Sequence, residues 1–287
     1  MYRRQYHSTT LFFLSFVGAF LAMGFLMVLF LLRLTGPGPT APAQPQAGQN
    51  AVYLPSAQDR LTLFAALEGP TGDSFALAGF YPDTGSMPLV VLPRQLALGG
   101  TTLQQLYRTG GAEEVLRLLG QEYGVAADRR VLLADSAAAA QLDRLGSVDL
   151  RLPTALYEKE SGLALGAGLQ AIDGSRALAL CRSSAWPGGE LQRCALLAEL
   201  GAAAVNTHLP AVLGDRAESL FKMAVNACRS TDLSAVDYET YLPAARFMAR
   251  LAVSPGQALA LSGSHDATGV FLPDEDSRRL LAELFGG

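Results

Sequence analysis

Residues 73–95 read DSFALAGFYPDTGSMPLVVLPRQ, and they carry the clearest structural signal of the chain. Its two apolar parts, residues 73–81 and 87–93, are rich in residues that favour β-strands. Residues 82–85 between them read PDTG, and proline, aspartate and glycine are typical of tight turns. The stretch therefore predicts a β-hairpin with two buried strands.

The two ends of this hairpin carry opposite charges. Asp73 starts the first strand and Arg94 follows the second, so the hairpin is expected to bring them together at one rim of a sheet. A carboxylate and a guanidinium at a rim suit a metal ion or a phosphate group, but they also suit a simple surface ion pair. The two residues alone leave both interpretations open.

The region before the hairpin predicts a membrane anchor. Residues 11–32 contain no charged side chain, and 22 helical residues at about 1.5 Å each span a hydrocarbon core of about 30 Å. Arg3 and Arg4 lie in the preceding residues 1–10, which we expect to be cytoplasmic, with the rest of the chain outside the cell membrane. Residues 33–50, rich in proline and glycine, are typical of a linker.

Residues 51–287 alternate between strand and helix patterns. Such alternation favours an α/β fold, and we expect an α-β-α sandwich with a mixed central sheet. Besides the hairpin, strands are predicted at residues 61–67, 130–134, 148–152, 163–170 and 257–262. Helices are predicted at residues 101–123, 136–145, 174–182, 190–204, 216–229, 233–251 and 276–285.

Charge and cysteine content exclude two kinds of partner. Residues 51–287 hold 26 acidic and 19 basic side chains, a net charge of −7 that does not suit nucleic acid. The cysteines, Cys181, Cys194 and Cys228, contain no CxxC pair, which argues against a structural zinc site. One disulfide with a free thiol, or three buried thiols, both remain open.

Two more arginines extend the candidate site. Arg182 opens the loop 182–189, and Arg193 lies in the first turn of the helix that follows. Arg193 precedes Leu196 and Leu197 by three and four residues, so it shares their inward face. A cation beside the free N–H groups of a helix start is a good position for an anion.

Taken in order, these elements resemble the LytR-CpsA-Psr family of cell-envelope proteins. The resemblance rests on the 73–85 segment with its turn, on VVLPRQ at 90–95 and on the double glycine at 110–111 with its helix. It also rests on DRLGSVD at 143–149 and on GLQAIDGSRAL at 168–178, which is followed by Arg182. The single predicted anchor fits as well.

The resemblance implies an extracytoplasmic phosphotransferase. Members of this family move a glycopolymer from a polyprenyl-pyrophosphate carrier to peptidoglycan, usually with Mg²⁺. Carried over to this chain, Asp73, Arg94 and Arg182 would be catalytic, and Arg94, Arg182 and Arg193 would bind pyrophosphate. Asp73 would hold Mg²⁺, with weak help from Gln95, which stands in place of the family's second carboxylate.

Further departures from the family pattern fall in the same site, so the chain resembles a divergent member. Ser184 replaces a loop arginine, and Glu190 stands where another arginine is expected. Exchanging an arginine for a glutamate beside pyrophosphate changes the local charge by two units, each worth a few kcal/mol at an effective dielectric of about 20. Two functions follow: a weakened phosphotransferase, or a catalytically inactive polyprenyl-phosphate-binding or scaffold protein.

Overall fold

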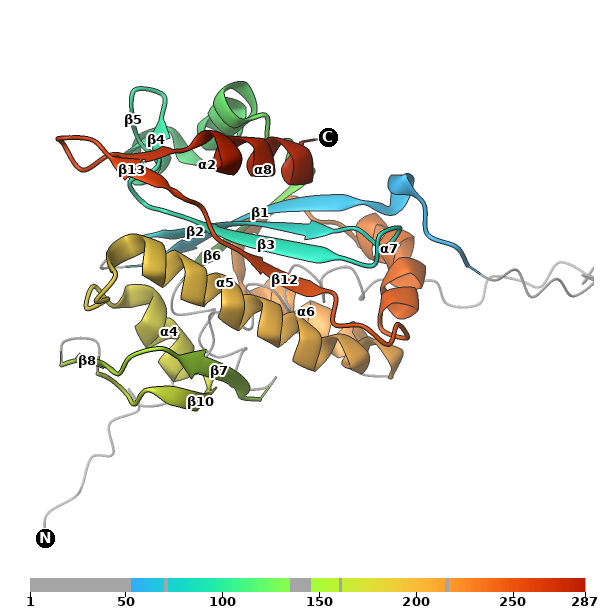
Figure 1. Cartoon of the computed structure of the whole chain (residues 1–287). Helices are drawn as coiled ribbons and strands as arrows, with labels where there is room; N and C mark the ends of the chain where they lie inside the picture. Colours follow the sequence, from blue (N-terminus) through green and yellow to red (C-terminus); the bar gives the residue numbers. More distant parts are fainter. Residues whose placement is uncertain (1–52, 70–71, 135–145, 160–161, 215–216, 287) are drawn as a thin grey trace, which may run out of the picture.

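The computed structural model describes residues 53–286 except 70–71, 135–145, 160–161 and 215–216 (Figure 1). The predicted tail, anchor and linker, residues 1–50, and the predicted helix 136–145 lie outside the described residues. Within the described part, one helical stretch, Gly189–Leu213, is long and apolar enough to cross a membrane. Of its most apolar window 56% is buried inside the domain, as expected of a core helix.

A six-stranded sheet forms the centre of the domain, with the strand order β11-β6-β1-β2-β3-β12 (Figure 1). β1 pairs antiparallel with β2 and parallel with β6, and β12 pairs parallel with β3, so the sheet is mixed, as predicted. Its strands are β1 (Leu61–Glu68), β2 (Ser74–Phe80), β3 (Met87–Leu92), β6 (Arg129–Ala134), β11 (Cys228–Thr231) and β12 (Gly256–Leu259).

The predicted hairpin is confirmed as β2 and β3. Phe75 lies opposite Leu92 at one end of the pair, and Ala78 lies opposite Leu89. The turn places Gly85 at φ 66°, a left-handed conformation that favours glycine. The turn lies beside α7 (Ala235–Met248), so Asp73 and Arg94 lie at the opposite end of the sheet (Figure 1).

Helices cover both faces of the sheet, which confirms the sandwich. The side chains of β1 alternate: Leu63 and Leu67 face one core cluster, and Phe64 and Ala66 face the other. On the first face lie α4 (Gly174–Arg182), α5 (Gly189–His208), α6 (Ala217–Ala227) and α7, and on the second lie α2 (Leu103–Tyr123) and α8 (Glu275–Phe285). α2 bends at Gly111, where φ is 72°.

Short strand pairs lie outside the central sheet. β7 (Val148–Leu152) pairs with β10 (Gly168–Ile172), and β8 (Leu156–Glu158) pairs with β9 (Leu163–Leu165). The remaining pairs are β4 (Ala97–Leu98) with β5 (Thr101–Thr102), and β13 (Gly263–His265) with β14 (Phe271–Pro273). Short 3₁₀ turns occur at η3 (Ala57–Asp59) and η4 (Leu209–Leu213).

Several predicted boundaries were wrong, among them those of the predicted helix 233–251, which is α7 and runs over Ala235–Met248. The predicted strand 163–170 is two strands, β9 and β10, separated before Gly168, whose φ is 95°. The predicted helix 216–229 ends at Ala227, because the chain continues as β11 along the edge of β6. The predicted strand 257–262 ends at Leu259.

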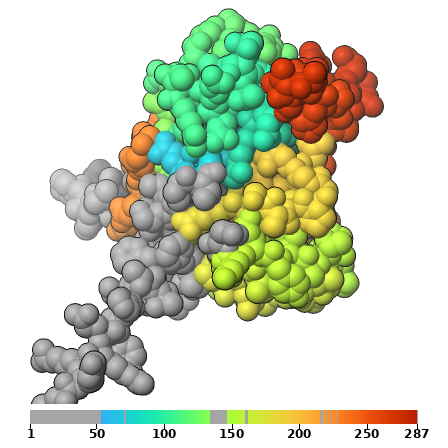
Figure 2. All heavy atoms as spheres, turned by 90° about the vertical axis from the view of Figure 1, so that its left-hand side faces the viewer, coloured from blue at the N-terminus to red at the C-terminus, as the bar shows by residue number. Residues whose placement is uncertain are grey.

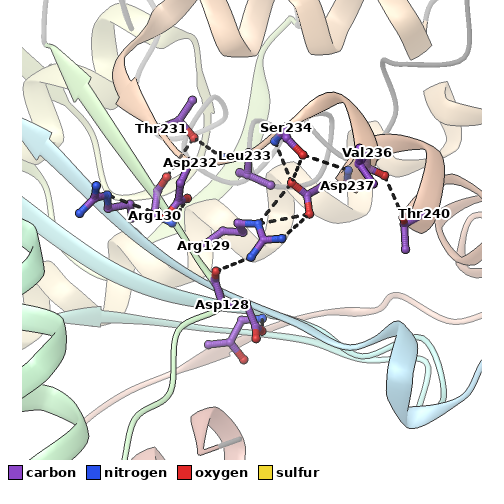
Figure 3. Close-up of polar contacts among 11 residues, drawn as sticks. Asp128, Arg129, Arg130, Thr231, Asp232, Leu233, Ser234, Val236, Asp237 and Thr240 are labelled. Carbon is purple, nitrogen blue, oxygen red and sulfur yellow. Dashed lines mark hydrogen bonds and ion pairs between the residues drawn. The ribbon is translucent and has the colours of Figure 1, made fainter.

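A polar network fixes the start of α7 against the start of β6 (Figure 3). The Arg129 guanidinium donates to the Asp237 carboxylate, with an Nη2–Oδ1 distance of 2.6 Å. The same carboxylate accepts from the backbone N–H and hydroxyl of Ser234, which closes a capping box at the helix start. Next to it, Asp232 accepts from the backbone N–H of Arg130 at 2.7 Å.

Replacing Gly256 with alanine is expected to lower the free energy of unfolding by about 1–3 kcal/mol. A Cβ at Gly256 would lie 2.5 Å from the carbonyl oxygen of Ala202 in α5. The Asn206 side chain also bonds both the N–H and the C=O of Gly256, so the strand cannot move away cheaply. Urea unfolding measures the change. Gly166→Ala is the control, because its Cβ would meet nothing closer than 3.7 Å.

Candidate functional site

The predicted site residues meet at one end of the central sheet. β1 ends at Glu68, β2 begins just after Asp73, and Arg94 follows β3, so all three lie at the same end of the sheet. The end of α4, at Cys181, and the start of α5, at Glu190, reach the same end of the sheet and contact Arg94. Figure 2 looks at this end of the molecule, with α2 in the upper half and α4 and α5 below.

Asp73 contacts two arginines in different ways. Its backbone carbonyl accepts a hydrogen bond from Arg94 Nε at 2.7 Å. Its buried carboxylate accepts from Arg108 Nε at 3.1 Å and from the N–H of Gly69 at 3.4 Å. The expected meeting of Asp73 and Arg94 is therefore correct, but the expected carboxylate–guanidinium pair was wrong, because the carboxylate pairs with Arg108.

Arg94 is half-buried and held by backbone carbonyl groups. Besides Asp73, the carbonyl of Cys181 accepts from its Nη2 at 2.8 Å. Gly72 lies against the guanidinium, where a Cβ would come within 3.2 Å of Arg94 Cζ. Burial and the charge of nearby Arg193 lower the pKa of Arg94. An anion next to Arg94 would relieve both effects.

Arg193 is the largest fully buried side chain of the described residues. Its Nε donates to Glu190 Oε2 at 2.7 Å, its Nη2 donates to the other Glu190 oxygen, and its Nη1 donates to Ser74 Oγ at 3.2 Å. Burial disfavours the charge, but the bonds to Glu190 outweigh it and raise the pKa of Arg193. The prediction that Arg193 faces inward is confirmed, yet each of its nitrogens already has an acceptor.

Glu190 is the counter-charge of this cluster. Its Oε1 also accepts the backbone N–H of Arg94 at 3.1 Å. Burial favours the neutral acid, but the bonds from Arg193 and the charges of Arg193 and Arg94 lower the pKa of Glu190. The acid that departs from the family pattern thus stays ionised between the two arginines.

The loop between α4 and α5 completes the candidate site at this end of the sheet. Arg182 is half-buried at the last position of α4, next to the carbonyl group that accepts from Arg94. Ser184 donates to Glu158 through both its backbone N–H and its hydroxyl, each at 2.9 Å. Trp186 is buried and donates to the carbonyl of Ser183.

The described residues do not form an all-protein Mg²⁺ site. No group of three histidine, cysteine, aspartate or glutamate side chains gathers anywhere in the described ranges, so a Mg²⁺ ion would depend on one or two carboxylates, on water and on phosphate oxygens of a ligand. The Asp73 carboxylate already pairs with Arg108. Gln95 is half-buried, and among the described residues its Oε1 has no hydrogen-bond partner, but a neutral amide oxygen adds no charge.

Cys194 and Cys228 are free thiols, and we expect Cys194 to resist alkylation in the folded protein. Burial raises the pKa of Cys194 to about 12, so almost no thiolate forms near neutral pH. Mass spectrometry after iodoacetamide treatment should show modification of Cys194 only in urea. A Cys194 disulfide in the purified protein would contradict this expectation.

Comparisons with known proteins support the same architecture. No curated protein sequence matches this chain. A protein of Eubacterium siraeum, described as a transcription regulator, superposes with a TM-score of 0.69 at 15% identity, over 86% of this chain and 98% of that one. TagV of B. subtilis gives 0.61 at 17% identity, over 79% and 97%. TagT bound to LI-WTA gives 0.59 at 15% identity, over 80% and 92%. At these identities the likeness shows the fold alone.

A family match identifies the chain more closely. The model of the LytR_cpsA_psr family matches residues 69–223, which is more than half of the 287 residues. The matched segment contains Asp73, Arg94, Arg182, Glu190 and Arg193. The chain therefore belongs to the LytR_cpsA_psr family.

Proposed function

We propose that this protein binds a polyprenyl-phosphate-linked glycopolymer of the cell envelope at the end of the central sheet around Arg94. Family membership supports this proposal, and so does the fold shared with TagT, which has been solved with LI-WTA bound. In this proposal the domain lies outside the cytoplasmic membrane and residues 11–32 anchor it, which keeps the site close to a lipid-linked ligand.

The observation that carries the proposal is the arginine cluster at this end of the central sheet. Arg94 is half-buried, lies next to the end of α4 with Arg182, and has backbone carbonyls rather than a carboxylate as partners of its guanidinium. Each phosphate of a lipid-linked pyrophosphate carries negative charge, and guanidinium groups bind phosphate oxygens in pairs of hydrogen bonds. A lipid-linked pyrophosphate therefore suits the arginine cluster.

Glu190 favours binding over transfer. A transferase needs its cations to stabilise the charge that develops on the leaving phosphate. Here the cation of Arg193 is buried and bonded to Glu190, so it cannot turn to a leaving phosphate without breaking that pair. No step of the proposed binding requires Mg²⁺.

Glycopolymer transfer to peptidoglycan is the second candidate function. It is favoured by the meeting of Asp73, Arg94 and the α4 end with Arg182, three of the positions that the family resemblance makes functional. In such a step a peptidoglycan hydroxyl attacks the phosphate next to the glycopolymer and loses its proton to solvent. The bond to the polyprenyl phosphate breaks, and polyprenyl phosphate leaves.

Thermal unfolding of the full-length protein in detergent tests the binding proposal. Undecaprenyl pyrophosphate at about a hundredfold over its Kd should stabilise the protein by about 2.7 kcal/mol. Arg94→Ala and Arg182→Ala should lose this stabilisation. Arg117→Ala, which removes an exposed arginine paired with Glu114, should keep it. The absence of any stabilisation in the natural protein would contradict the proposal.

A transfer assay separates the two candidate functions. Full-length protein is incubated with a lipid-linked glycopolymer and peptidoglycan, and mass spectrometry follows polymer-bearing muropeptides. Binding without transfer is expected. Transfer that disappears in Arg94→Ala but persists in Arg117→Ala would make the second candidate the function of this protein.

A further inference from the structure

Arg108 is an arginine of the site that sequence reasoning missed. It lies on α2, and its side chain is 54% exposed, whereas the Asp73 side chain that it contacts is 7% exposed. Its Nε donates to the buried carboxylate. No described residue accepts a hydrogen bond from the two terminal nitrogens of Arg108, so one edge of the guanidinium is fixed and the other is open to a ligand.

A second arginine on the same helix shows what a fully paired guanidinium looks like. Arg117 has a similar exposure of 50%, but all three of its nitrogens have acceptors. Nε and Nη2 donate to the two oxygens of Glu114, and Nη1 donates to Gln121. Arg108 therefore differs from an ordinary surface arginine of α2 in its free hydrogen-bonding capacity.

Asp73 contacts both Arg108 and Arg94. Its carboxylate accepts from Arg108 Nε, and its backbone carbonyl accepts from Arg94 Nε. Both guanidinium groups are thus oriented by one buried residue at the start of β2. Arg94 Nη1, like the terminal nitrogens of Arg108, has no acceptor among the described residues. Guanidinium groups with open donors bind phosphate oxygens, and both of these groups contact the same residue.

The charge balance at this end of the sheet favours an anion over a metal ion. Arg94, Arg108, Arg182, Arg193 and Arg229 give five positive charges against the four of Glu68, Asp73, Glu158 and Glu190, a net charge of 5 − 4 = +1. The carboxylates of Asp73 and Glu190 are already bonded to guanidinium groups. A divalent cation at Asp73 would have to share the carboxylate with Arg108 and lie near the charge of Arg94, which Coulomb repulsion opposes.

We propose that Arg108 is a ligand-binding residue of this site and that it occupies the place of a metal ion, so that the site binds pyrophosphate without Mg²⁺. This inference deepens the proposed glycopolymer binding and rests on it for the identity of the natural ligand. The guanidinium of Arg108 supplies the positive charge and the hydrogen-bond donors at Asp73.

Calorimetric titration of full-length protein with inorganic pyrophosphate in EDTA tests the inference. The natural protein should bind, and Arg108→Gln should weaken binding by about 10- to 100-fold, the range expected for lost hydrogen bonds to a charged group. Arg108→Lys should retain part of the affinity, because it keeps the charge but not the fork of donors. Arg117→Gln is the matched control and should bind like the natural protein.

A parallel titration with undecaprenyl pyrophosphate, in EDTA and in excess Mg²⁺, separates this inference from the proposed function. Equal affinity in both conditions, lost in Arg108→Gln, supports both. Binding that EDTA abolishes, or that Arg108→Gln leaves intact, overturns the role of Arg108 while the proposed function stands. Pyrophosphate binding through Arg108 without binding of the lipid-linked ligand overturns the proposed function alone. Failure of both probes to bind overturns both.

Discussion

Replacing Glu190 with alanine is expected to lower the free energy of unfolding by about 3–5 kcal/mol. The change leaves the Arg193 guanidinium buried without its carboxylate, and removing one partner of a buried ion pair leaves an uncompensated charge. Ser74 and the carbonyl of Cys181 remain as acceptors, but neither carries a charge. Urea unfolding of both proteins at neutral pH measures the difference.

The double replacement Glu190→Leu with Arg193→Met is the control for this prediction. It removes both charges, and hydrophobic residues of similar volume often replace a buried pair without loss. The double variant should therefore be more stable than Glu190→Ala, which a double-mutant cycle would detect as coupling. A cost of less than about 1 kcal/mol for Glu190→Ala would show that Arg193 finds solvent, and would contradict its burial.

Asp237→Ala is expected to cost about 2–4 kcal/mol. The buried Asp237 carboxylate accepts from Arg129 and closes the capping box with Ser234, so the change removes a helix cap and an ion pair together (Figure 3). Asp276→Ala is the matched control. Its pair with Arg279 has the same 2.6 Å distance but is exposed, and we expect a loss of less than about 1 kcal/mol.

The same carboxylate gives the stability of Asp237 a pH dependence with a defined sign. Burial raises the pKa of Asp237, but the bonds from Arg129 and Ser234 lower it below the value of an unfolded aspartate. Its contribution is therefore complete above the unfolded pKa of about 3.8 and is lost as the pH falls through the folded pKa. The gap in unfolding free energy between natural protein and Asp237→Ala should narrow in acid below about pH 4. A gap that widens would contradict the assignment.

Local signals predicted the hairpin and most helices, because turn chemistry and apolar periodicity act over a few residues. β11 escaped prediction for the opposite reason. Residues 228–231 follow a helix directly and read CRST, which has no alternation, and they form a strand only because β6 offers an edge almost a hundred residues earlier in the chain. Tertiary pairing of this kind overrides local preference.

The site was predictable to a similar depth. Asp73, Arg94 and Arg193 meet as expected, because a hairpin and a helix face fix them. The partners of these residues were harder to predict. Glu190 and Arg193 are three residues apart, and that helical spacing brings opposite charges together, so their pairing was within reach of the sequence. Arg108 was not, because the rotation of α2 against the start of β2 depends on packing that no local pattern encodes.

The position of β12 has a consequence for how the chain reaches its native state. β12 pairs with β3 in a register that joins Gly256 to Met87, a sequence separation of 256 − 87 = 169 residues. Synthesis runs from the N-terminus, so β3 has no partner on its outer side until the last part of the chain has been made. Pairing between such distant segments also forms slowly. Until then, a strand whose side chains are all buried in the native fold presents an unpaired edge, which is a template for aggregation. Residues 69–223, the segment that the family model matches, lack β1, β11 and β12 and are therefore expected not to fold alone.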